Sequence, residues 1–247
     1  MKLLVCVSKT PDTTTKIAFN AEGTALDTNG IQYIMNPYDE WYALVRALEL
    51  CEAAGGGKVT LINVGAAAND SVIRKGLAIG ADEAVRIDAE PQSAMYVARQ
   101  IAAYAAKESF DIIFLGKETI DYNGSEVGAM LAEMLDLPFI SYASHLDMNG
   151  NTATITRDIE GGAEKVAVET PFVISAAKGL AEQRIANMKG IMMAKKKPLT
   201  VIAPVDFADP VVAVQYELPP PKSAVKLIDP NNMDELVRLL HEEAKVI

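Results

Sequence analysis

The chain has 247 residues, of which 50% are hydrophobic and 23% are charged. This balance indicates a globular protein with a core of useful size and excludes wholesale disorder. The 33 acidic and 23 basic residues give a formal net charge of −10. Because nucleic-acid-binding proteins carry basic surfaces, we expect no nucleic-acid partner. No apolar stretch approaches the roughly 20 residues that span a bilayer, so we expect no membrane insertion.

Two features of the sequence bear on the cellular compartment. Cys6 and Cys51 are the only cysteines, too few for a disulfide framework, so both are expected to be reduced. The apolar run at the N-terminus is too short for the hydrophobic region of a signal peptide. We therefore expect a cytoplasmic protein, or one of the mitochondrial matrix if the source is eukaryotic.

Strand and helix patterns alternate along the first part of the chain. Apolar runs that predict buried strands lie at residues 3–7, 59–64, 84–87 and 111–115. Helical patterns lie between and after them, at residues 40–51, 70–79, 91–107 and 128–135. Asn69 or Asp70 is expected to cap the second helix and Gly80 to end it. Continuous apolar strands separated by helices predict right-handed βαβ units and a parallel sheet covered on both faces.

The pattern changes after Pro138. Further strands are expected at residues 139–144, 152–158, 165–169 and 172–176, the middle two forming a hairpin around Gly161 and Gly162. The whole set predicts an α/β fold: an open, mainly parallel sheet of the Rossmann-like type with a β-hairpin. Ligands of such sheets bind at the carboxyl ends of the strands, near the point where the strand order reverses.

The last part of the chain is expected to form an arm. Prolines at 204, 210 and 219–221 prevent residues 205–221 from folding on themselves, so this stretch should run extended over another surface. A final helix is expected at residues 232–244. The chain therefore divides into an α/β domain, residues 1–204, and an appendage, residues 205–247.

The sequence contains few candidate catalytic residues. Neither of the two histidines, His145 and His241, has a metal-ligand partner three or four residues away. The sequence contains no Gly-x-Ser-x-Gly elbow, Cys-x-x-Cys pair or Walker loop. We therefore expect no catalytic residues and no metal site, and a protein that is not itself an enzyme.

The loop from Gly116 to Gly128 is the strongest candidate for ligand binding. It follows the most apolar strand, runs into a helix, and contains three glycines together with Thr119 and Ser125. Backbone N–H groups at a helix start favour a phosphate, and small residues allow the backbone to approach it. An ordinary βα loop that uses glycines for turning would look similar, so the pattern alone leaves both interpretations open.

The segment from Arg184 to Lys197 combines methionines with basic residues around Gly190. This composition suits an adaptable protein-contact surface. A solvated lysine run beside a few core methionines would give the same composition, and composition alone favours that second interpretation.

In chain order, six segments are similar to the beta subunit of electron-transfer flavoprotein: Leu3 to Val7, Met35 to Tyr38, Ile73 to Asp82, Gly116 to Gly128, Ile159 to Gly162, and Arg184 to Lys197. The resemblance covers nearly the whole chain. It implies a non-catalytic electron carrier that forms a heterodimer with a larger alpha subunit. The heterodimer carries electrons from acyl-CoA-type dehydrogenases, as in fatty acid oxidation, to a membrane quinone reductase.

The resemblance also implies cofactors and their sites. The redox-active FAD sits mainly on the alpha subunit, at the heterodimer interface, whereas the beta subunit holds a buried structural AMP. The positions implied to bind AMP are Cys6, Asn36, Pro37, Tyr38, Asp39, Val64, Gly116, Lys117, Glu118, Thr119, Ile120, Asp121, Tyr122, Asn123, Gly124, Ser125, Glu126 and Val127. Asp158 matches a family residue that helps hold the mobile FAD domain of the partner subunit, and residues 205–247 are implied to pack on that subunit.

A docking role for the segment 184–197 follows from the same resemblance. In the family this segment contacts the dehydrogenase, with an apolar anchor at the position of Met188. The implied docking residues are Met188, Ile191, Met192, Lys195 and Lys196.

Two alternatives stay open. Electron-bifurcating relatives hold a second FAD in place of AMP, but they typically have Asp-Gly-Asp-Thr where this chain has the loop 121–125. An ATP-binding or nucleotide-hydrolysing α/β enzyme is the other. Hydrolysis would have only Lys117, Asp121 and Ser125 for its chemistry, and a plain ATP-binding module needs neither the docking segment nor the arm.

Overall fold

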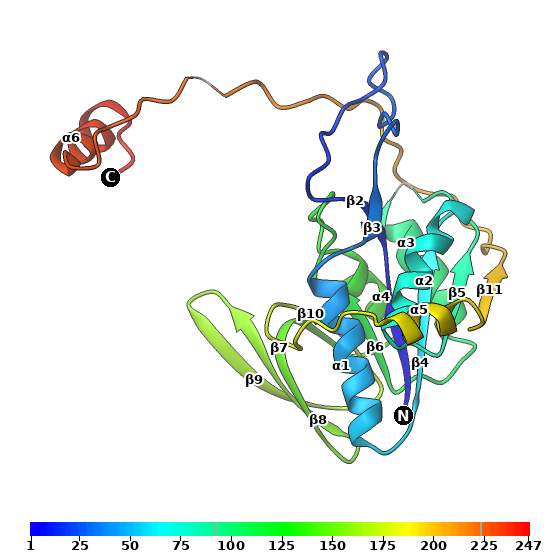
Figure 1. The fold of residues 1–247 in the computed structure, drawn as a ribbon. Helices are drawn as coiled ribbons and strands as arrows, with labels where there is room; N and C mark the ends of the chain where they lie inside the picture. The colour runs from blue at the N-terminus through cyan, green and yellow to red at the C-terminus, as the bar shows by residue number, and fades with distance from the viewer. Residues whose placement is uncertain (92, 223) are drawn as a thin grey trace.

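The computed structural model describes residues 1–91, 93–222 and 224–247. Within that part of the chain a nine-stranded sheet has the order β11-β5-β4-β1-β6-β10-β7-β8-β9 (Figure 1). Its parallel part comprises β1 (Lys2–Cys6), β4 (Lys58–Val64), β5 (Glu83–Ile87), β6 (Ile112–Gly116), β10 (Phe172–Ala176) and β11 (Leu199–Ile202). β7 (Phe139–Asn149) lies parallel to β10 and starts an antiparallel meander with β8 (Thr152–Ile159) and β9 (Gly162–Glu169).

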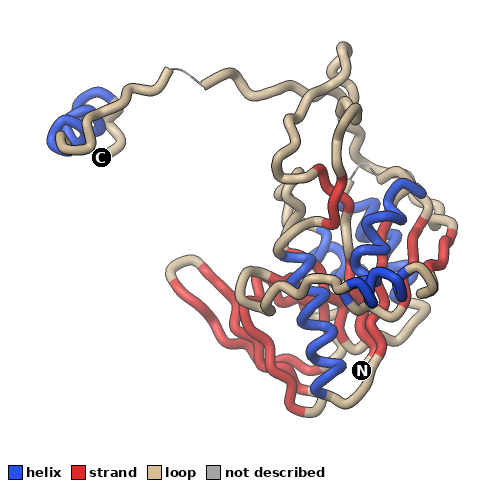
Figure 2. The backbone as a smooth tube through the Cα atoms, in the orientation of Figure 1, coloured by secondary structure: helices blue, strands red, loops and turns tan. Residues whose placement is uncertain are grey.

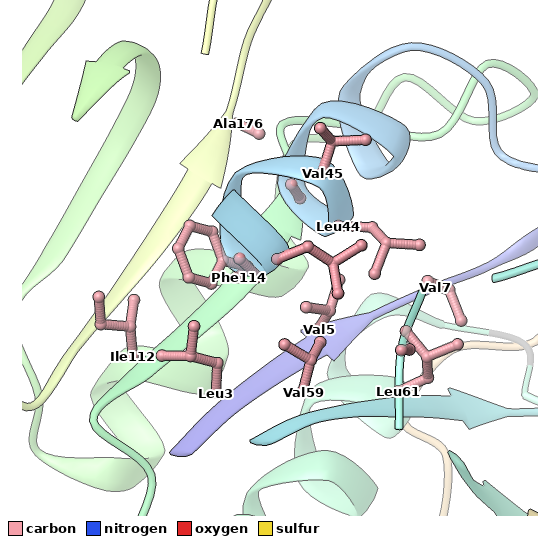
Figure 3. Close-up of a cluster of buried hydrophobic side chains, with 14 of the residues drawn as sticks. Leu3, Val5, Val7, Leu44, Val45, Val59, Leu61, Ile112, Phe114 and Ala176 are labelled. Atoms are coloured by element: carbon pink, nitrogen blue, oxygen red, sulfur yellow. The ribbon is translucent and has the colours of Figure 1, made fainter. Parts of the chain in front are cut away.

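Helices cover both faces of the parallel part. α1 (Asp39–Ala53) and α2 (Asp70–Ile79) pack on one face, and α3 (Ala94–Ala105) and α4 (Val127–Leu135) on the other. Successive side chains of a strand point to opposite faces, and β1 follows this rule. Leu3 and Val5 join the core cluster under α1, which Figure 3 shows, while Leu4 and Cys6 join the cluster under α3 and α4. The predicted fold class is confirmed.

The strand order reverses at β1. From β1 the chain builds β4 and β5 outward on one side, and then returns to place β6 and β10 on the other. The carboxyl ends of β1 and β6 therefore meet at the switch point, where a Rossmann-like sheet opens a crevice for ligands.

Several elements differ from the sequence prediction. β7 continues to Asn149 rather than ending at Ser144, because it pairs with β8 along that length. Two short strands, β2 (Lys9–Pro11) and β3 (Tyr33–Met35), form a separate antiparallel pair that was not predicted. Asn69 occupies the N-cap position of α2, but its side chain donates to Asn63 instead of capping the helix.

The arm leaves the domain after β11. Figures 1 and 2 show it running as a loop past the segment between β2 and β3 and then away from the sheet. It ends in α6 (Met233–Arg238), which continues as a π-helical turn, Leu239–Glu243. None of the helices in the described ranges is both long enough and apolar enough to cross a membrane.

Candidate functional site

The switch point gathers the strand ends that the sequence singled out. Cys6 ends β1, Val64 ends β4 and Gly116 ends β6. Gly116 is required there, because an added Cβ would lie 2.9 Å from Cγ of Glu40 and 3.0 Å from its backbone nitrogen. The absence of a side chain thus lets the start of α1 pack directly on the end of β6.

Asn36 fixes the loop that follows β6. Its side chain is completely buried. Nδ2 donates to the carbonyl oxygen of Glu118 at 3.0 Å, and Oδ1 accepts from the amide of Ile120 at 3.0 Å. The carboxamide therefore fixes the conformation of the loop through two hydrogen bonds to the loop backbone.

The start of α4 presents a row of backbone donors. Asn123 and Ser125 adopt positive φ values of 49° and 53°. Within the part of the chain that the structure describes, the amides of residues 124–128 donate to no acceptor. Alternating left- and right-handed backbone turns successive N–H groups into an anion-binding nest, and the helix dipole adds positive potential. This arrangement can hold a phosphate.

Charged side chains surround this nest. The hydroxyl of Ser125 donates to Glu118 Oε2 at 3.1 Å, and Lys117 Nζ lies 3.1 Å from Glu118 Oε1. Because Glu118 is already engaged by a cation and a hydroxyl, its repulsion of an incoming anion is reduced. The other side of the site is apolar, since Cys6, Val64 and Val127 belong to one hydrophobic cluster.

A cavity of about 350 Å³ opens beside the nest, on the α1 side of the sheet. It contains predicted site residues together with four that the sequence did not indicate: Tyr42, Tyr142, Ala177 and Lys178. The predicted residues on its wall are Pro37, Tyr38, Asp39, Lys117, Glu118, Ile120 and Asp158. The predicted AMP set therefore falls into two neighbouring parts, one lining the cavity and one around the start of α4.

Two tyrosines of the cavity have unusual backbones. Tyr38 has φ 65° and ψ −93° and a side chain that is 59% exposed, and Tyr142 has φ 56°. Such conformations cost of order 1–3 kcal/mol and persist where the surrounding structure enforces them, often at functional sites. The strain at Tyr142 arises where the pairing of β7 shifts register, so no local sequence signal could have revealed it.

Burial shapes the electrostatics at the start of α1. Burial raises the pKa of Asp39 to about 6, with Lys117 opposing the shift. Glu40 is fully enclosed, and burial raises its pKa to about 8 although Ser8 donates two hydrogen bonds to it. Burial also raises the pKa of the Cys6 thiol, which is therefore unreactive as a nucleophile.

Three of the five candidate docking residues, Met188, Ile191 and Met192, lie on a short helix within the segment 184–197. α5 (Met188–Ala194) begins at Asn187, whose side chain accepts from the amide of Gly190 at 2.8 Å. Met188 is 74% exposed and Met192 67% exposed, with Ile191 and Met193 also at the surface. The interpretation of these methionines as core residues is therefore wrong. Lys195 and Lys196 follow directly and are exposed.

Comparison with known proteins decides the family. A family model described as the electron transfer flavoprotein domain matches residues 23–207. The electron transfer flavoprotein subunit beta of Bacillus subtilis is 36% identical, and that of Homo sapiens 32% identical, each across all of this chain and 99–100% of the relative. The chain belongs to the electron transfer flavoprotein beta-subunit family. A mitochondrial relative from Oryza sativa is 32% identical over the full length of both chains.

Membership of the electron transfer flavoprotein family confirms two predictions, electron transport and association with a flavoprotein. Among the described residues, no group of three histidine, cysteine or acidic side chains could hold a metal ion. His145 is exposed, and its Nε2 lies 2.9 Å from Oδ2 of Asp147 on the same strand.

Proposed function

We propose that the chain is the small subunit of a heterodimer whose larger alpha subunit carries most of the FAD contacts. The heterodimer accepts electrons from acyl-CoA-type dehydrogenases and passes them to a quinone reductase. Family membership supports this role. Two separate features support two sites on this chain: the nest at the start of α4, which packs on one face of the sheet, and the exposed apolar face of α5, which packs on the other.

In this proposal AMP occupies the site at α4. The amides of residues 124–128 can donate to its phosphate, and the apolar side chains of Cys6, Val64 and Val127 suit a purine ring. When bound, AMP supplies no redox chemistry. The loop after β6 and the ends of β1 and β4 would together hold it, so its role in this chain would be structural.

The cavity beside the nest faces the partner's FAD domain in this proposal. Exposed aromatic rings at Tyr38 and Tyr142 suit a large apolar partner surface. Asp158 lies on the same wall, where its exposed carboxylate accepts from the hydroxyl of Ser144 at 3.1 Å. A carboxylate held in this way can receive a cationic side chain of the mobile domain.

The nucleotide assignment is tested by counting cofactors. We expect the denatured heterodimer to release one AMP and one FAD. Gly124→Glu should abolish AMP binding and weaken assembly, because the new carboxylate would occupy the phosphate site and repel the phosphate. Gly124→Ala is the matched control, since its Cβ would lie 3.7 Å from the nearest atom, and it should retain AMP. Two FADs per heterodimer would overturn the AMP assignment in favour of the bifurcating alternative.

The docking assignment is tested at Met188. Interfaces concentrate their energy in a few apolar anchors, each worth at least about 2 kcal/mol on truncation. Met188→Ala should therefore lower the affinity for the dehydrogenase by roughly thirtyfold and leave the melting temperature unchanged. The affinity is obtained from dehydrogenase-coupled flavin reduction. Val201→Ala, a truncation at the half-exposed Val201 of β11, should change neither quantity. A normal coupling rate in Met188→Ala would remove Met188 from the interface.

A further inference from the structure

α5 is too short to be stable by itself. It has seven residues, whereas isolated helices below about 12 residues are marginal in water. Its one buried side chain is Ala194, so a hydrophobic face does not hold it in place. Something else must fix the helix against the domain and set the direction in which its exposed apolar face points.

The first constraint is close contact with α2. An added Cβ on Gly190 would lie 2.4 Å from the carbonyl oxygen of Ala78, near the end of α2. Real Cβ atoms do not approach an oxygen that closely, so only glycine allows α5 to lie at this separation. Figure 1 shows the short α5 lying beside α2 after the chain has crossed α1.

The second constraint is an exchange of hydrogen bonds between the two helix ends. Lys197, just after α5, donates from Nζ to the carbonyl oxygens of Leu77 at 3.0 Å, Gly80 at 3.0 Å and Ala81 at 2.6 Å. These carbonyls belong to the last turn of α2 and the residues after it, where a helix leaves acceptors unpaired and its dipole attracts a cation.

Arg74 of α2 makes the return contact. Its Nη1 donates to the carbonyl oxygen of Ala194 at 2.7 Å and to that of Lys197 at 2.6 Å. Each helix end is thus capped by a cation from the other element, and hydrogen bonds from charged donors are about twice as strong as neutral ones. The segment before α5 is also tied to α1, because Trp41 Nε1 donates to the carbonyl oxygen of Arg184 at 2.9 Å.

The three consecutive lysines therefore have different roles. Lys195 and Lys196 are exposed and free to meet an acidic partner surface, whereas the ammonium group of Lys197 is directed inward onto three carbonyl oxygens. From composition alone the three lysines form one basic patch. The hydrogen bonds distinguish Lys195 and Lys196, which can contact a partner, from Lys197, which anchors the segment.

We propose that Arg74, Gly190 and Lys197 are positioning residues that lock α5 onto α2 and present its apolar face to the dehydrogenase. This inference rests on the docking role proposed above for Met188. It adds that the docking helix is held rigid before the partner arrives, and that the lock lies outside the contact surface. Preorganisation of this kind raises affinity by reducing the ordering cost of binding.

The experiment compares Lys197→Met with Lys196→Met in the assembled heterodimer. Both substitutions remove one ammonium group and keep an unbranched side chain. Two quantities are measured on each: amide hydrogen exchange in α5, and the KM for a reduced acyl-CoA-type dehydrogenase with kcat obtained separately. We expect Lys197→Met to speed exchange in α5 by ~tenfold or more, to raise KM with kcat unchanged, and to keep FAD content. Because Lys196 is itself a proposed contact residue, Lys196→Met should also raise KM at low salt, but it should leave exchange in α5 unchanged, so the exchange measurement separates the anchoring lysine from the contact lysine.

Gly190→Ala is a second variant, for which an independent helix and a helix locked onto α2 predict opposite changes in the exchange rate. Alanine stabilises an isolated helix by about 1 kcal/mol relative to glycine, so a helix that did not depend on α2 would exchange more slowly. The lock instead requires faster exchange and a raised KM, because the new methyl group must push α5 away from Ala78.

Unchanged exchange in both Lys197→Met and Gly190→Ala would overturn the lock. Faster exchange with an unchanged KM, in an assay where Met188→Ala does raise KM, would overturn the positioning role and leave the docking proposal intact. An unchanged KM in Met188→Ala would overturn the docking proposal itself, and the positioning role with it. If Lys197→Met fails to assemble, the result for Gly190→Ala decides.

Discussion

At the first turn of α1, the carboxyl group of Glu40 is buried against Ser8, which donates to it from its amide and its hydroxyl, both at 2.7 Å. Burial, together with smaller contributions from the nearby carboxylates of Asp121 and Asp39, raises the pKa of Glu40 from an ordinary value of 4.5 to about 8. Between these pH values the folded state retains a proton that the unfolded state releases. Stability that Glu40 contributes below pH 4.5 is therefore lost as the pH rises toward 8.

Glu40→Gln should remove this pH dependence, because a carboxamide stays neutral throughout. We expect the melting temperature of the variant, relative to the unaltered chain, to rise steadily between pH 5 and pH 8. The gain should reach about 1 kcal/mol or more, since one pKa unit is worth about 1.4 kcal/mol. Thermal unfolding across this range measures it. Glu52→Gln serves as the control, because Arg184 lowers the pKa of Glu52 and its effect falls below this window. Parallel curves for Glu40→Gln and the unaltered chain would contradict the assignment.

At the residue scale, the sequence predicted those features that depend on neighbouring residues alone, whereas the ligand roles of these residues stay predictions. Gly124 and Ser125 were predicted beside a helix start from their small size and their position, and the structure gives that loop the backbone of a nest. Tyr142 could not be found in this way. It reaches the cavity because β7 shifts register against both β8 and β10, a result of pairing between distant segments.

At the scale of elements, the sequence was most informative where a turn or a capping position marks both ends. The bounds of α2 and β10 agree with the prediction to the residue, because a capping position or turn marks each end. α5 was missed since its seven residues include a glycine and depend on Arg74 and Lys197 for stability. β2 and β3 were missed because each has only three residues and is defined by its pairing with the other.

The position of α4 gives a prediction at this scale. An added Cβ on Gly128 would lie 2.8 Å from the ring of Phe139 at the start of β7. Gly128→Ala should therefore lower the melting temperature by several degrees, since overpacking costs about 1–3 kcal/mol. Tilting of α4 should also weaken AMP retention. Calorimetry and nucleotide release measure the two effects. Gly162→Ala, where no atom lies within 4 Å, should show neither. A stabilised Gly128→Ala would show that helix propensity outweighs the contact.

At the scale of the whole molecule, the arm is joined to the domain by a few specific contacts. Gln100 of α3 donates to the carbonyl oxygen of Val205 at 3.0 Å and accepts from its amide at 2.7 Å. Farther along, the amide of Tyr216 donates to the carbonyl oxygen of Gly23 at 2.6 Å, and its ring stacks on Phe19 at 5.3 Å. Between and beyond these contacts the arm exposes apolar side chains, among them Val211, Val212, Val214, Leu218 and Leu227.

Exposed apolar side chains on an extended segment require a partner surface, or they promote aggregation. We therefore expect the full chain expressed alone to be colourless and prone to aggregate. Removing residues 209–247 should improve its solubility and leave its melting temperature within about 2 °C, because the deleted part adds almost nothing to the core. The same deletion should abolish stable pairing with the alpha subunit, measured by copurification of a yellow heterodimer. A deleted chain that still copurifies with the flavin-bearing subunit would show that the arm is not needed for assembly. A loss of many degrees would show instead that the arm belongs to the folding unit, and the aggregation of the full chain would then need another cause.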